Sequence, residues 1–147
     1  MNRLRPILLV EDSTEDIELV LAALKKNNFA NEVVVARDGV EALDYLYRRG
    51  RFASSLTVLP IVMLLDLKMP RKDGLEVLRE VKGDENLKVI PVVMLTSSRE
   101  EADLVRSYHL GVNAYVVKPV GFHQFVDAIK QTGNFWAVIN EPPPASG

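Results

Sequence analysis

Five short runs of hydrophobic residues alternate along the chain with longer segments of mixed polarity. The runs lie at residues 6–10, 31–36, 60–65, 91–95 and 113–117, and they are rich in Val, Ile and Leu. Short apolar runs bounded by turn residues are typical of strands that are buried on both faces. We therefore predict five strands at these positions.

Each hydrophobic run is followed by a segment predicted to be helical. These segments lie at 13–28, 38–50, 74–84, 98–110 and 121–133. Ser13 or Thr14 can cap the first helix, and Asp38 and Gly50 are predicted to bound the second. Residues 51–60 are predicted to form a loop.

Alternating strands and helices indicate an α/β fold with helices on both faces of a parallel sheet. Because crossover connections are right-handed, few strand orders are possible. We predict a single doubly wound, five-stranded parallel sheet in the order 2-1-3-4-5 with five helices, which is a flavodoxin-like arrangement.

Composition narrows the class of protein. The 147 residues predict one domain over 1–140, followed by a Pro-rich, disordered tail over 141–147. A net charge of −2 gives no sign of a nucleic-acid surface. No hydrophobic run is long enough to cross a membrane, and the absence of Cys excludes disulfides and thiolate metal sites. We expect a cytoplasmic protein.

Polar residues that could bind a ligand or take part in a reaction follow four of the five predicted strands. Glu11 and Asp12 follow the first strand, Asp66 the third, Thr96 the fourth and Lys118 the fifth. The carboxyl ends of parallel strands meet at one edge of a sheet, where ligands of open α/β sheets bind. We therefore expect these five side chains to converge there.

Three neighbouring carboxylates need a counterion, and oxygen ligands of this kind suit Mg²⁺. A lysine and a threonine hydroxyl would add a second cation and a donor for phosphate oxygens. Together these groups suit phosphoryl transfer, which depends on positioning and charge neutralisation. Asp66 is central in the predicted sheet and is the best candidate for a nucleophilic carboxylate.

Four motifs in order resemble the receiver domain of two-component response regulators. They are VEDS at the first strand end, LLDLKMPRKDG around the third, LTSS at the fourth and GVNAYVVKP at the fifth. The resemblance covers roughly residues 5 to 130, and four motifs at this spacing are highly specific. It implies that Asp66 is phosphorylated to an aspartyl phosphate by a sensor histidine kinase in a Mg²⁺-dependent reaction.

The resemblance also implies roles for the neighbours of Asp66. Glu11 and Asp12 would form the acidic pair, with Asp12 a direct Mg²⁺ ligand and the backbone carbonyl of Lys68 a further one. Such a domain is not an enzyme with a separate substrate; it undergoes its own phosphotransfer and autodephosphorylation.

Other residues are implied to bind the phosphoryl group or to signal its presence. Thr96 and Lys118 would bind the phosphoryl oxygens, and Tyr115 stands at the family's switch aromatic position. The Lys118–Pro119 peptide bond is expected to be cis.

A narrower resemblance is to the single-domain regulators that partner bacterial phytochromes. It is carried by DGVEALDYLYRRG, by LTSSREEADLVRSYHLGVNAYVVKP and by FWAVIN followed by prolines. Two positions depart from the receiver pattern: Glu11 stands where many receivers have Asp, and Lys68 where many have Asn. Because Lys68 borders the phosphoryl group, the departure bears on reaction rates.

Two other functions fit part of the pattern. A haloacid-dehalogenase-type phosphatase also uses Asp, Thr, Lys and Mg²⁺, but it needs an acid two residues after the nucleophile, where this chain has Lys68. A degenerate receiver used as a binding module would not need the intact acids. Since no output domain follows, we expect signalling by protein contact, phosphorelay or a homodimer, with Phe135 and Trp136 either packed on the core or exposed for docking.

Overall fold

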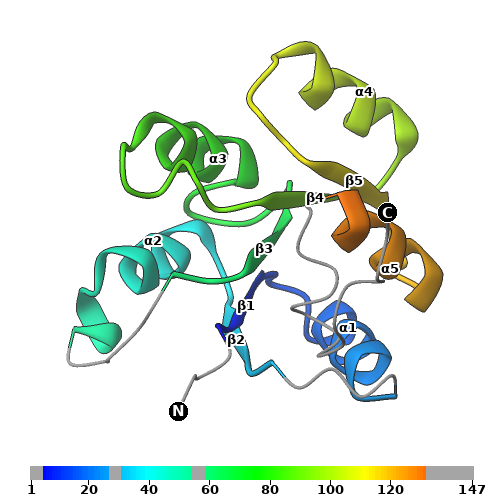
Figure 1. Cartoon of the computed structure of the whole chain (residues 1–147), viewed down its shortest axis with the longest axis horizontal. Coiled ribbons are helices and arrows are strands. Elements are labelled where there is room, and N and C mark those ends of the chain that lie inside the picture. Colours follow the sequence, from blue (N-terminus) through cyan, green and yellow to red (C-terminus); the bar gives the residue numbers. More distant parts are fainter. Residues whose placement is uncertain (1–4, 27–30, 54–58, 132–147) are drawn as a thin grey trace, which may run out of the picture.

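The computed structural model describes residues 5–26, 31–53 and 59–131 (Figure 1). Its five strands form one sheet in the order β2-β1-β3-β4-β5. Every pair of neighbouring strands is parallel. The predicted doubly wound sheet and its strand order are confirmed.

The strands coincide with the hydrophobic runs of the sequence. They are β1 (Ile7–Val10), β2 (Val33–Ala36), β3 (Val62–Asp66), β4 (Val92–Thr96) and β5 (Ala114–Val117). The helices are α1 (Thr14–Lys26), α2 (Gly39–Tyr47), α3 (Gly74–Gly83), α4 (Arg99–Ser107) and α5 (Phe122–Gln131), with a short 3-10 helix η1 at Gly50–Phe52. The five predicted helices are therefore present.

The sheet separates two hydrophobic cores. Helices α1 and α5 lie on one side of it, and α2, α3 and α4 lie on the other (Figure 1). Successive residues of a strand point to opposite faces, so Leu64 packs with α1 and α5 while Leu65 packs on the α2 and α3 side. This explains why β3 is hydrophobic throughout rather than alternating.

The end of the second helix was predicted wrongly. Helix α2 ends at Tyr47, and Arg48 adopts the left-handed conformation (φ 55°) that we had assigned to a glycine cap at Gly50. Gly50 instead begins η1, which extends into the predicted loop. The buried ring of Phe52 explains this turn, because it packs edge-on against Tyr45 with 5.1 Å between ring centroids.

Side chains cap α1 and α4, two helices that follow loops at the carboxyl edge of the sheet. Ser13 Oγ accepts from the Asp16 N–H at 3.2 Å, so Ser13 is the cap of α1. Ser98 Oγ accepts from the Glu101 N–H at 3.1 Å and caps α4. Each satisfies a backbone donor that the first turn of a helix leaves free.

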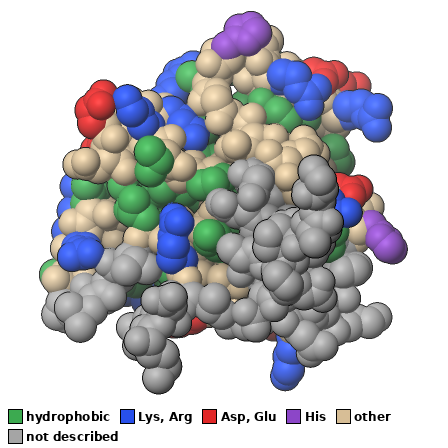
Figure 2. Space-filling model, viewed as in Figure 1, with side chains coloured by type: hydrophobic (Ala, Val, Ile, Leu, Met, Phe, Trp, Pro, Cys, Tyr) green, Lys and Arg blue, Asp and Glu red, His purple; other side chains and the backbone are tan. Residues whose placement is uncertain are grey.

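Figure 2 shows one face of the molecule. On its described part, hydrophobic side chains lie in small groups between Lys and Arg side chains. The large exposed ones are spread along the chain: Leu19, Tyr47, Val89, Leu104, Tyr108 and Val117. Among the described residues, no helix is both long and apolar enough to cross a membrane. The predictions for the tail and for Phe135 and Trp136 concern positions outside the described residues.

Candidate functional site

The carboxyl edge of the sheet brings together the side chains of Glu11, Asp12, Asp66 and Lys118, and Thr96 lies at the end of the neighbouring strand β4. Backbone hydrogen bonds between adjacent strands anchor this edge: Glu11 N–H donates to the Ala36 carbonyl (2.9 Å), and Lys118 N–H donates to the Thr96 carbonyl (2.8 Å). Directly after Asp66, the Leu67 N–H donates to the Leu95 carbonyl (3.0 Å). The site is thus built on strand ends, which are rigid compared with loops.

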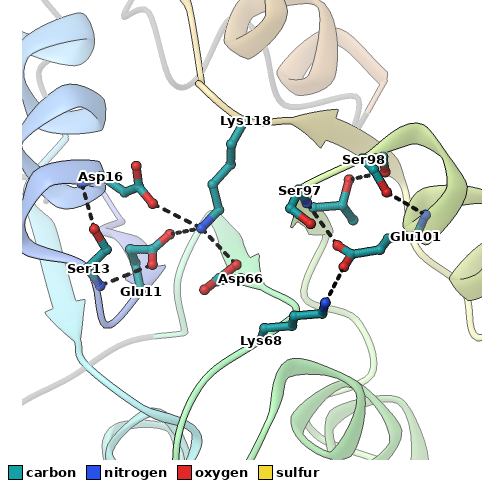
Figure 3. Close-up of polar contacts among 10 residues, drawn as sticks. Glu11, Ser13, Asp16, Asp66, Lys68, Ser97, Ser98, Glu101 and Lys118 are labelled. Carbon is teal, nitrogen blue, oxygen red and sulfur yellow. Dashed lines mark hydrogen bonds and ion pairs between the residues drawn. The ribbon is translucent and has the colours of Figure 1, made fainter.

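Lys118 is the centre of the charged cluster (Figure 3). Its Nζ lies 2.9 Å from Glu11 Oε1, 3.0 Å from Asp66 Oδ1 and 3.1 Å from Asp16 Oδ2. The Lys118–Pro119 peptide bond is cis, as predicted. One ammonium therefore contacts carboxylates from β3, from the residue after β1 and from the first turn of α1.

Asp66 is a buried carboxylate with only 4% of its surface exposed. Burial, and then the charge of Glu11, raise the pKa of Asp66 to about 7, although Lys118 opposes the shift. Burial alone would lower the pKa of Lys118, but its hydrogen bonds to Glu11 and Asp66 outweigh this and raise that pKa. The ammonium therefore stays charged while Asp66 is poised between its two forms near neutral pH.

Three carboxylates of the cluster could hold a metal ion. Glu11, Asp12 and Asp66 each offer one oxygen, and these atoms lie within 4.8 Å of one another. Glu11 and Asp66 are buried, whereas Asp12 is exposed. The raised pKa of Asp66 indicates that Lys118 alone does not compensate the buried negative charge. A hard divalent cation fits this all-oxygen donor set.

Thr96 and Tyr115 lie on the neighbouring strands. The buried Thr96 hydroxyl donates to the Ser98 carbonyl at 3.1 Å, so it is engaged by its own loop. Tyr115 in β5 is half-buried, and the guanidinium of Arg106 in α4 stacks 4.6 Å from its ring centroid. Thr96 thus lies at the carboxyl edge of the sheet, and the Tyr115 ring packs between its own strand and α4.

Lys68 lies on the opposite side of Asp66 from Lys118 (Figure 3). Its Nζ pairs with Glu101 Oε2 at 2.7 Å, and its side chain is 77% exposed. Glu101 Oε1 also accepts from the Ser97 N–H at 2.9 Å. The Lys68 ammonium, followed by the Ser97 N–H, lowers the pKa of Glu101 to about 2, so this carboxylate is charged at neutral pH.

Sequence reasoning missed three contacts around the site. Asp16 pairs with Lys118, Glu101 pairs with Lys68, and Arg37 donates to the Asp12 carbonyl at 3.1 Å. Asp16 and Glu101 stand in the first turns of α1 and α4, where acids are common for helix stability alone. That position was the only signal, and it does not identify a partner.

Comparison with known proteins agrees with this fold. The family model described as the response regulator receiver domain matches residues 7–130. The response regulator Rcp1 of Synechocystis sp. is 41% identical over 135 residues, which cover 92% of this chain and 90% of Rcp1.

Solved structures extend the comparison to phytochrome regulators. The bacteriophytochrome response regulator AtBRR is 64% identical, with a TM-score of 0.90 over 95% of this chain and 100% of that one. The Mn(2+)-bound form of Rcp1 is 40% identical, with a TM-score of 0.73 over 96% of this chain and 99% of that one. The chain therefore belongs to the response regulator receiver domain family, and phytochrome response regulators are among its relatives.

Proposed function

We propose that the chain is a phosphorylation-controlled switch in which Asp66 accepts a phosphoryl group from a histidine of a sensor kinase. The observation that carries the proposal is the Asp66 carboxylate itself. It is buried at the carboxyl edge of the sheet, with Lys118 Nζ 3.0 Å away and two further acids beside it. Its relatives include phytochrome response regulators, which supports a phytochrome-type kinase as the donor. We propose that the reaction takes place in the cytoplasm.

The reaction is a displacement at phosphorus. One carboxylate oxygen of Asp66 attacks the phosphorus, and a new O–P bond forms. The N–P bond to the kinase histidine breaks, and its electron pair returns to the imidazole nitrogen. Lys118 neutralises charge on the transferred oxygens, since its ammonium already contacts Asp66.

The acidic cluster would hold a divalent cation, for which Mg²⁺ is the candidate. The carboxylates of Glu11, Asp12 and Asp66 and the backbone carbonyl of Lys68 would be its ligands from this chain. When bound, the cation neutralises charge that builds up on the phosphoryl oxygens. A solved structure of the relative Rcp1 is described as Mn(2+)-bound, which supports a divalent cation here.

The response to phosphorylation would spread through Thr96 and Tyr115. The Thr96 hydroxyl would leave the Ser98 carbonyl for the phosphoryl oxygens, and Tyr115 would change its packing against Arg106. The face made by α4 and β5 would then change its contacts. We propose that this face signals to a protein partner, a second copy or the next carrier of a phosphorelay, and not to nucleic acid.

The phosphatase alternative is less well supported. Lys68 stands where that chemistry needs an acid, and its ammonium is paired with Glu101. Turnover of an aryl phosphate by the protein would favour the phosphatase. A degenerate binding module would show no labelling at all. Solution mass with and without beryllofluoride would show whether phosphorylation controls self-association.

The central test is covalent labelling of Asp66. With a small acyl phosphate or a phosphorylated phytochrome kinase as donor, we expect one phosphoryl group per chain by intact mass spectrometry, only when Mg²⁺ is present. Asp66→Asn should abolish it, because the amide is not a nucleophile. Asp103→Asn, on the exposed side of α4, is the matched control and should label normally. Labelling of the Asp66→Asn protein would overturn the proposal.

A further inference from the structure

Glu101 lies across the site from Lys118, and its carboxylate contacts Lys68 and Ser97 rather than Lys118 (Figure 3). Its Oε2 holds the Lys68 ammonium at 2.7 Å, and its Oε1 accepts from the Ser97 N–H at 2.9 Å. Only 17% of its side chain is exposed. A single carboxylate therefore joins the loop after Asp66 to the loop after Thr96.

The two loops follow Asp66 and Thr96, to which the proposed function assigns acceptance and binding of the phosphoryl group. Lys68 follows Asp66 by two residues, and its ammonium is directed at Glu101 in the resting structure (Figure 3). Ser97 and Ser98 follow Thr96, whose hydroxyl is bound to the Ser98 carbonyl. Glu101 also donates its own N–H to Ser98 Oγ. The resting arrangement of both loops thus depends on one residue of α4.

We propose that Glu101 is a positioning residue that restrains phosphoryl transfer to Asp66, by holding the Lys68 ammonium away from the reacting oxygens. The inference rests on the proposed function and adds to it a residue outside the receiver motifs. A donor phosphate is anionic, so a released Lys68 would attract it and neutralise charge on the transferred group. Because Lys68 is exposed, its pair with Glu101 is weak enough to exchange for a phosphoryl oxygen.

Glu101→Gln separates the charge from the hydrogen bond. The amide oxygen can still accept from the Ser97 N–H, so the loop after Thr96 keeps its support. Only the attraction for Lys68 is lost. We expect labelling by a small acyl phosphate to become about three- to fivefold faster, the scale of an exposed ion pair. The half-saturating concentration of beryllofluoride should fall by a similar factor.

Glu100→Gln is the matched control, since it removes the same charge from the adjacent, exposed position of α4. Its labelling rate should stay within twofold of the unmodified chain. In a Lys68→Met background, Glu101→Gln should have no further effect on rate or on beryllofluoride affinity, because the cation that it releases is gone. A purely structural role for Glu101 would not depend on Lys68.

The outcomes separate this inference from the proposed function. If Asp66 of the unmodified chain labels but Glu101→Gln changes neither the rate nor the affinity, Glu101 has no positioning role and the receiver function stands. An equal gain with Lys68 and with Met at position 68 would also overturn the inference. If the unmodified chain does not label at all, the proposed function itself is wrong.

Discussion

Asp66 is a carboxylate kept where its charge is unfavourable. Burial and Glu11 raise its pKa to about 7 from an ordinary 3.8. The folded chain therefore binds a proton that the unfolded chain releases between about pH 4 and pH 7. Stability must fall as pH rises through this window, and the loss is complete above it. A reactive group thus costs the resting fold stability near neutral pH.

Asp66→Asn should for this reason stabilise the protein without metal, and more so at high pH. In the presence of a chelator we expect the Tm to rise by a few degrees at pH 8, consistent with about 1–2 kcal/mol. Near pH 4 the gain should be small, since the folded carboxyl group is still neutral and the unfolded one is only partly ionised. Thermal unfolding followed by circular dichroism at several pH values measures this.

Asp127→Asn on exposed α5 serves as the control for the loss of one carboxylate, and its Tm change should stay small at every pH. A gain for Asp66→Asn that is equal at pH 4 and pH 8 would contradict the assigned cause. So would a lower Tm at pH 8, because that would mean that the pair with Lys118 outweighs the cost of burial.

The strands could be predicted because burial on both faces leaves a plain signal of consecutive Val, Ile and Leu. Strand ends then gave the positions of Glu11, Asp66, Thr96 and Lys118 at one edge. Helix ends were harder: Arg48 takes the left-handed conformation because Phe52 must reach the core beside Tyr45, a tertiary cause with no local sign. Contacts between elements, such as Glu101 with Lys68, depend on spatial placement that no spacing records.

The start of α3 packs directly against the end of β3. A Cβ on Gly74 would overlap the Asp66 carbonyl oxygen and lie 2.9 Å from Leu67 Cα. The Gly74 N–H meanwhile donates to the Leu67 carbonyl at 2.8 Å. The absence of a side chain at this position thus lets α3 begin directly beside the reactive aspartate.

Gly74→Ala should therefore lower stability by about 1–3 kcal/mol, the cost of forcing atoms into a packed position. It should also slow labelling of Asp66, because the strand end must shift. Gly83→Ala at the other end of α3 is the control: nothing lies within 4 Å of its Cβ, and Ala favours a helix, so stability should hold or rise by up to about 1 kcal/mol.

Urea denaturation measures both variants. An unchanged midpoint for Gly74→Ala, together with an unchanged labelling rate, would contradict this prediction. It would show that the junction between β3 and α3 can accommodate a methyl group.

The two hydrophobic cores share one sheet, so they should unfold together. Leu64 and Leu65 are adjacent, are both fully buried and face opposite cores. Replacing either with Ala should cost about 2–5 kcal/mol. We expect one cooperative unfolding transition for each variant. When one core unfolds, β3 is exposed on that face, and the other core then loses the strand against which it packs.

Amide hydrogen exchange and circular dichroism in urea can be compared for Leu64→Ala and Leu65→Ala. Helices on both sides should lose protection at the same midpoint in each variant. Separate midpoints for α1 with α5 and for α2 with α3 would show two independently folding halves.

The backbone hydrogen bonds that anchor Glu11, Leu67 and Lys118 to neighbouring strands involve no helix. The reacting groups are thus fastened to the inner sheet, whereas the outward faces of the helices carry the residues that a partner would meet. Over evolutionary time, the exposed positions of α1 and α4 can exchange one set of side chains for another without moving the aspartate. Such a division lets duplicated copies acquire new partners while the chemistry stays constant.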